Sequence, residues 1–133
     1  MQYPNAVTDR ELVVRYVVDK SSYRPSDNTL KHSLFMPAPD NELSVYRISE
    51  LVFDEIIDLG VKFVSNPRNK KLLGYASLQA EHIIRQDLRF EPTNEPNPRH
   101  ANVIGWSEKA ANILKAARLA ENATLTLAKN GSG

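Results

Sequence analysis

The stretch FEPTNEPNPRHANVIGWSEKAANILKAARLA, residues 90–120, joins a proline-rich loop to an apolar extended segment and then to a helical run. Proline restricts its own backbone and that of the preceding residue, so Pro92 should end a strand at residues 88–91. Residues 101–106 are apolar and extended in character, and Ser107 is the expected cap of the following helix. The many alanines of that helix favour close packing against a sheet or another helix.

Strand-forming residues also cluster in the first half of the chain. Residues 11–18 contain two adjacent pairs of valines, which favour a strand that is partly covered on both faces. In residues 43–48, the side chains of Leu43, Val45 and the stem of Arg47 should share one face of a strand. Shorter extended segments are expected at residues 33–36, 72–76 and 124–127.

Two further helices are expected from serine caps followed by apolar residues at helical spacing. The first begins after Ser49 and ends either at Gly60 or, as we favour, just before Pro67. A glycine inside a helix costs only about 1 kcal/mol, and the apolar spacing continues beyond it. The second begins after Ser77 and reaches about Gln86.

Three helices interleaved with several strands predict an α+β fold. We expect a small mixed or antiparallel sheet with about three helices packed mainly on one side. A chain of 133 residues fits one domain, which we place at residues 1–128, with a flexible tail at residues 129–133. No apolar run approaches the roughly 20 residues that cross a membrane, and the polar start lacks a secretory pattern. These features predict a cytoplasmic protein without a membrane partner.

The chain contains no cysteine, which excludes a disulfide framework, a thiolate metal site and a cysteine nucleophile. The three histidines, His32, His82 and His100, stand apart without metal-ligand spacing. The glycines form neither a phosphate loop nor a dinucleotide fingerprint, and no serine lies in a Gly-x-Ser-x-Gly turn. We therefore expect neither a metal nor a cofactor, and the chain shows no catalytic motif.

Charge is divided unevenly along the chain, although its net value is only +1. Residues 1–66 carry 7 Lys or Arg and 10 Asp or Glu, a net charge of −3, whereas residues 67–133 carry 10 and 6, a net charge of +4. Such an asymmetry can steer an anionic partner toward one face. The candidate binding residues are Arg99, His100, Arg68, Lys70, Lys71 and Arg47.

Each candidate has two interpretations. Arg99 and His100 either grip a phosphate or carboxylate, or they bond to the loop backbone and to solvent. Arg47 is either an inward-facing anion ligand, or its stem is buried and its head pairs with a carboxylate. His82 follows Glu81, which with Arg85 has the spacing of a helical ion pair, so a structural role is expected for His82.

The segments Leu-Ser-Val-Tyr-Arg, at residues 43–47, and Arg-His-Ala-Asn-Val-Ile-Gly-Trp, at residues 99–106, resemble recurring stretches in a group of small uncharacterised bacterial proteins. The resemblance covers residues 34–120. It implies a bacterial, cytosolic origin, and it implies no activity, cofactor or site residue.

The sequence thus predicts a small binding or adaptor module that recognises a protein or an anionic partner through its basic loop surface. Nucleic acid is one such partner, bound through basic side chains and stacking on Tyr75, Phe90 and Trp106. One alternative is an enzyme for a nucleotide or other phosphorylated substrate, with Arg47 and Arg99 as anion ligands and His100 as acid or base. A second alternative is an oligomeric structural component assembled through the alanine-rich helix.

Overall fold

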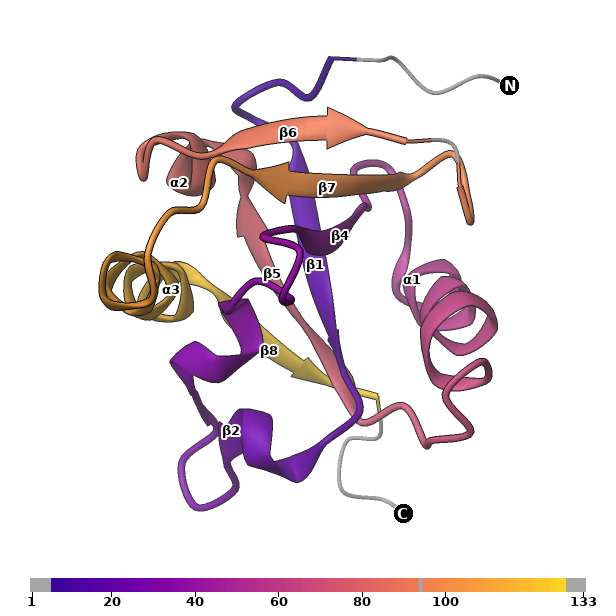
Figure 1. Cartoon of the computed structure of the whole chain (residues 1–133). Coiled ribbons are helices and arrows are strands. Elements are labelled where there is room, and N and C mark those ends of the chain that lie inside the picture. The colour runs from indigo at the N-terminus through magenta and orange to yellow at the C-terminus, as the bar shows by residue number, and fades with distance from the viewer. Residues whose placement is uncertain (1–5, 94, 129–133) are drawn as a thin grey trace.

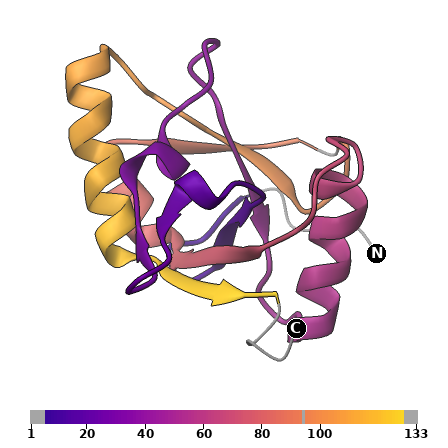
Figure 2. The ribbon, with the colours of Figure 1, turned by 90° about the horizontal axis from the view of Figure 1, so that it is seen from below.

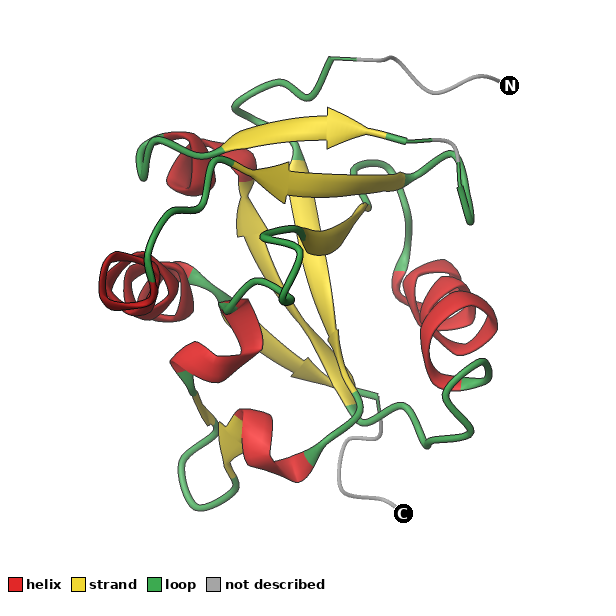
Figure 3. Ribbon diagram, viewed as in Figure 1, coloured by secondary structure: helices red, strands yellow, loops and turns green. Residues whose placement is uncertain are grey.

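A computed structural model describes residues 6–93 and 95–128, and the tail expected at residues 129–133 lies outside this part of the chain. Figure 1 shows the arrangement of its elements, and Figure 3 shows their types. The strands are β1 (Leu12–Val17), β2 (Tyr23–Arg24), β3 (Thr29–Leu30), β4 (Leu43–Arg47), β5 (Gly74–Gln79), β6 (Arg89–Pro92), β7 (His100–Ile104) and β8 (Thr124–Leu127). The α-helices are α1 (Phe53–Gly60), α2 (Ala80–Ile84) and α3 (Lys109–Asn122). Three shorter helical segments are η1 (Lys20–Ser22), η2 (His32–Phe35) and η3 (Val61–Ser65).

Six of the described strands form one antiparallel sheet in the order β6-β7-β4-β1-β5-β8. Strands β2 and β3 form a separate small hairpin. These strands and the helices around them confirm the predicted α+β fold with an antiparallel sheet.

The central strand β1 is covered on both faces. Val13 and Val17 enter one hydrophobic core, whereas Val14 and Tyr16 enter another on the opposite face. Strand β4 divides its apolar residues in the same way, because successive side chains alternate between faces. The adjacent valine pairs that break a simple alternation are explained by this double burial.

The helices lie on the two faces of the sheet (Figures 1 and 2). Helices α2 and α3 and the 3-10 segment η2 contribute to one core, which contains Phe35, Ile83, Ala116 and Leu119. Helix α1 covers the other face, where Ile56 and Leu59 pack with residues of β1, β4 and β5. Two of the three helices thus share one face, and both cores rest on a single sheet.

Residues 33–36 are not extended, as the sequence suggested, but fall largely within the 3-10 segment η2. The 3-10 segment η2 places both Leu34 and Phe35 in the core. In an extended strand these adjacent side chains would point to opposite faces. Burial of a large aromatic side chain therefore decides the local conformation here.

The first long helix begins later than expected. Val52 is its N-cap, and the carboxylate of Glu55 accepts a hydrogen bond from the Val52 amide at 3.0 Å. The hydroxyl of Ser49 accepts a hydrogen bond from the amide of Leu12 at 2.9 Å, so it bonds to the start of β1 instead. The favoured continuation beyond Gly60 is confirmed, because the π-helical segment η3 follows α1 directly.

The other two serines expected as caps are also not caps. Ser77 lies within β5 and pairs with Val14, so the second helix begins only at α2, after Gln79. Ser107 lies before α3, whose N-cap is Glu108. The amide of Ser107 donates a hydrogen bond to Oδ1 of Asn112 at 2.9 Å. The segments expected at residues 88–91 and 101–106 are present with shifted bounds as β6, which includes Pro92, and β7, which ends at Ile104, whereas β8 has the expected bounds.

Gly60 lets α1 approach the aromatic side chain of β1. A Cβ atom at this position would overlap the ring of Tyr16, whose hydroxyl donates to the Ile56 carbonyl at 2.7 Å. We expect Gly60→Ala to lower the free energy of unfolding by about 1–3 kcal/mol, because overpacking outweighs the helix propensity gained. Urea denaturation would measure this, with Asp58→Ala on the exposed face as a control that changes stability by about 0.5 kcal/mol or less. An increase in the stability of Gly60→Ala would contradict the steric argument.

Candidate functional site

Arg47 lies at the end of β4 and is almost completely buried, with 1% of its surface exposed. Its Nε and Nη2 atoms each donate to a carboxylate oxygen of Glu11 at 2.8 Å, and Nη2 also donates to the Ala6 carbonyl at 3.0 Å. Burial by itself raises the pKa of Glu11, but the hydrogen bonds from Arg47 and from the Thr8 amide, together with the charge of Arg47, outweigh it, so the pKa lies below its ordinary value. The head of Arg47 therefore pairs with a carboxylate, which is the structural alternative of its two interpretations.

Arg99 extends the same end of the sheet. Its carbonyl accepts the Arg47 amide at 2.8 Å, and its Nη1 atom donates to the Arg47 carbonyl at 3.1 Å. The positive charge of Arg99 also helps to lower the pKa of Glu11. The structure thus brings Arg99 together with Arg47 and Glu11.

His100 begins β7 and lies in a different environment from its neighbour. Its ring is buried and contacts Tyr46 edge-on, with ring centroids 5.2 Å apart. Nδ1 lies 2.7 Å from Oγ1 of Thr93, and Nε2 lies 3.0 Å from Oγ of Ser44. Burial lowers the pKa of His100 below its ordinary value, so the imidazole is neutral at pH 7.

The basic residues of the loop after η3, Arg68, Lys70 and Lys71, have different surroundings. The ammonium group of Lys70 forms an ion pair with Asp19 at 2.7 Å, and Lys71 is exposed. Arg68 is exposed too, but it lines a cavity of about 200 Å³ together with His100. Two of the predicted residues from separate parts of the chain therefore meet at one cavity.

The cavity lies where β1, β4, β7 and η3 meet. Nine of the described residues line it, and they include two arginines, two tyrosines, a serine and a histidine: Arg15, Tyr16, Ser44, Tyr46, Phe63, Val64, Arg68, Pro96 and His100. The hydroxyl of Tyr16 is engaged with Ile56, whereas that of Tyr46 has no hydrogen-bond partner among the described residues. Burial raises the pKa of Tyr46, which keeps its hydroxyl protonated as a donor.

Arg15 is the important cavity residue that sequence reasoning missed. The backbone pairing of β1 with β4 ends at Val14, opposite Tyr46, and the side chain of Arg15 continues it by donating to the Ser44 carbonyl at 2.8 Å. Its Nε atom donates to the Leu34 carbonyl at 2.9 Å. The feature of the sequence that could have identified Arg15 is its position as a single arginine within a valine-rich strand.

The charge of Arg15 is poorly compensated. Burial, and secondarily the positive charge of Arg68, lower the pKa of Arg15 to about 10, which leaves the guanidinium charged at neutral pH. Neither arginine forms an ion pair with a carboxylate in the part of the chain that the structure describes. The cavity therefore combines two cations with protein donors and no opposing charge.

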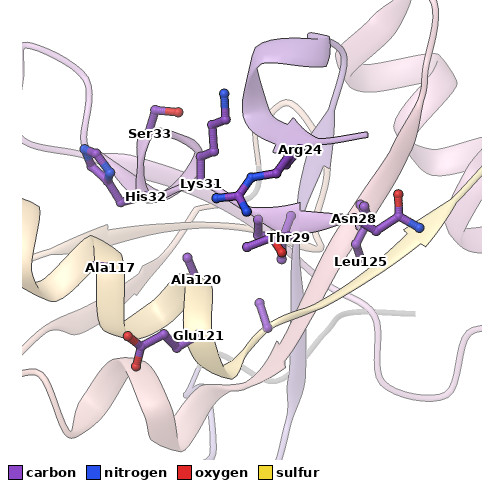
Figure 4. Close-up of a pocket in the computed structure, with 12 residues that line it drawn as sticks. Arg24, Asn28, Thr29, Lys31, His32, Ser33, Ala117, Ala120, Glu121 and Leu125 are labelled. Carbon is purple, nitrogen blue, oxygen red and sulfur yellow. The ribbon is translucent and has the colours of Figure 1, made fainter. Parts of the chain in front are cut away.

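A second, larger cavity of about 590 Å³ lies between the β2-β3 hairpin, η2, α3 and β8 (Figure 4). Lys31 and His32 line one side, and Glu121 lies with Ala117 and Ala120 on α3. Arg24 at this cavity forms an ion pair with Asp27 at 3.2 Å. Because the wall carries both signs of charge, it favours no single class of charged ligand.

The remaining predicted residues have structural surroundings. His82 is half-buried on α2, and the expected ion pair between Glu81 and Arg85 is present at 3.3 Å. Trp106 and Tyr75 are buried, and Phe90 packs partly against a core, so these rings are not open platforms for stacked bases. No group of three potential metal ligands occurs within residues 6–93 and 95–128.

The ion pair of Arg47 with Glu11 generates a prediction about stability. Glu11→Gln should reduce the free energy of unfolding at pH 7 by about 3 kcal/mol, because a buried guanidinium loses its charged partner. The folded-state pKa of Glu11 is depressed, so its stabilising contribution is present above the ordinary value of 4.5 and is lost as pH falls through the folded value. Denaturation of both proteins from pH 7 to pH 3 should show the difference shrinking at acid pH. A difference that is constant across this range would contradict the assignment.

No helix within the described residues is long and apolar enough to cross a membrane. No protein-family model matches the chain, and comparisons with curated proteins and with solved structures found no significant match.

Proposed function

We propose that the protein is a small binding module that holds a compact oxyanion, a phosphate or a carboxylate of its ligand, in the cavity between Arg15, Arg68 and His100. The observation that supports this function is the presence of two guanidinium groups on one cavity without a carboxylate partner among the described residues. An oxyanion would compensate both charges, and guanidinium donors match its oxygens in pairs.

The electrostatics of Arg15 favour this choice of ligand. Its charged form is disfavoured by burial and by the neighbouring cation, as its lowered pKa indicates. An anion in the cavity would offset the repulsion from Arg68 and would supply an acceptor for the guanidinium of Arg15. The hydroxyl of Tyr46 and the exposed guanidinium of Arg68 add donors at the same cavity.

The size of the cavity favours a small ligand group. Pockets for drug-sized molecules span roughly 300–1,000 Å³, whereas this cavity measures about 200 Å³. Lys71 is exposed on the same loop as Arg68, where it can attract an anion approaching the cavity. The buried aromatic rings make extended single-stranded nucleic acid a weaker candidate.

The alternative of assembly through α3 receives less support. Ala116 is fully buried and Ala120 packs against the same core, so the small-residue face is used inside the molecule. Leu114 is 60% exposed on this helix, and isolated apolar residues of this kind are normal on surfaces.

Inorganic phosphate is the simplest probe of this function. We expect saturable binding in an NMR titration, with shifts centred on the cavity, and about tenfold weaker binding by Arg68→Ala, because one charge-assisted contact is lost. The matched control is Lys109→Ala, which removes an equal charge at the start of α3, outside the cavity lining. Its affinity should stay within about twofold of the unmodified protein.

Absence of saturable phosphate and acetate binding would contradict the proposed function. Equal weakening in Arg68→Ala and Lys109→Ala would also contradict it, since a general charge effect needs no cavity.

A further inference from the structure

Three side chains at the cavity wall are connected by hydrogen bonds in a single row. Oγ1 of Thr93 lies 2.7 Å from Nδ1 of His100, and Nε2 of His100 lies 3.0 Å from Oγ of Ser44. The residues come from the segment after β6 and from β7 and β4, so the sheet brings them together (Figure 1).

The one hydroxyl proton of Thr93 determines which atom donates and which accepts in each of these hydrogen bonds. The single hydroxyl proton of Thr93 is donated to a carbonyl, that of Glu95 at 2.8 Å, with the His100 carbonyl at 3.3 Å as a weaker acceptor. Oγ1 must therefore accept from Nδ1–H, which places the lone pair of the neutral imidazole on Nε2. The hydroxyl of Ser44 then donates its proton to Nε2.

This direction matches the requirements of an activated nucleophile. A hydroxyl becomes reactive when an adjacent base can take its proton and a third group orients that base. Thr93 holds Nδ1, the ring of Tyr46 packs edge-on against the imidazole, and burial keeps His100 neutral. Ser44 and His100 both line the cavity in which the anion would bind.

Two guanidinium groups line the same cavity as Ser44. The guanidinium of Arg15 donates to the carbonyl of Ser44 at 2.8 Å, and Arg68 lines the same cavity. Fixed cations stabilise the negative charge on the oxygens of a phosphoryl group during transfer.

We propose that Ser44 is a nucleophile, activated by His100, that accepts the phosphoryl group of a phosphate monoester bound in this cavity. The proposal rests on the proposed function, since the cavity must first bind the anion. It specifies the ligand as a phosphate monoester and adds a reaction to binding.

The reaction proceeds in two balanced steps. In the first, Oγ of Ser44 forms a bond to phosphorus, the bond to the leaving alcohol breaks, and the serine proton passes through Nε2 of His100 to that alcohol. In the second, His100 takes a proton from water as the water oxygen attacks phosphorus. The bond from phosphorus to Oγ breaks, and the proton returns from Nε2 to Ser44. The products are an alcohol and inorganic phosphate.

The test uses para-nitrophenyl phosphate as the chromogenic substrate and mass spectrometry to locate a phosphoryl group on Ser44. We expect turnover to be lost in Ser44→Ala and to fall by about 10²–10⁴-fold in His100→Gln. Ser107→Ala is the control, because it removes an exposed serine outside the cavity. Turnover should also fall as acid protonates His100, with the midpoint below pH 6.5 because its pKa is depressed.

Phosphate binding measured on the same proteins separates this proposal from the proposed function. Thermal unfolding should show that Ser44→Ala is folded, so that loss of its turnover reports on the hydroxyl. Ser44→Cys restores a nucleophile and should become phosphorylated if position 44 is the acceptor. Phosphate binding without turnover or a phosphorylated Ser44 overturns the catalytic proposal alone, whereas absence of phosphate and acetate binding overturns both.

Discussion

The guanidinium of Arg15 occupies the point where β1 and β4 stop pairing, and the cavity depends on this arrangement. A charged side chain in a central strand needs acceptors, and the carbonyls of Leu34 and Ser44 supply two of them. The cost of this placement remains visible in the lowered pKa of Arg15. A cation held by neutral carbonyls, with a second cation on the same cavity, is the arrangement that supports the proposed binding of an anion.

The rest of the sheet gives this environment its rigidity. The two hydrophobic cores hold β1 from both faces, and the ion pair of Arg47 with Glu11 links the end of β4 to the residue before β1. Arg47 and Arg99 thus contribute to architecture, while Arg68 and His100 line the cavity. Neighbouring residues in the sequence, Arg99 and His100, serve these two regions separately.

The helix boundaries illustrate how tertiary structure overrides a local preference. Serine at a helix start is favoured because its hydroxyl can accept an orphan amide, but Ser49 accepts the amide of Leu12 and Ser77 is paired within the sheet. At Gly60 the local pattern predicted the structure correctly, since the apolar spacing continues beyond the glycine and the helical segment continues with it. The close approach of Tyr16 then explains why glycine is suitable there.

Periodicity and residue type by themselves determined the α+β class, the doubly covered first strand and most strand positions, and they nominated Arg68 and His100 as candidate binding residues. These properties follow from local backbone preferences and from which faces must be buried. The tertiary structure decided that Arg15, Ser44 and Tyr46 join those two residues, and that Arg47 pairs with Glu11. The physical reason is that contacts across the sheet depend on strand order and register, which bring together side chains far apart in the chain.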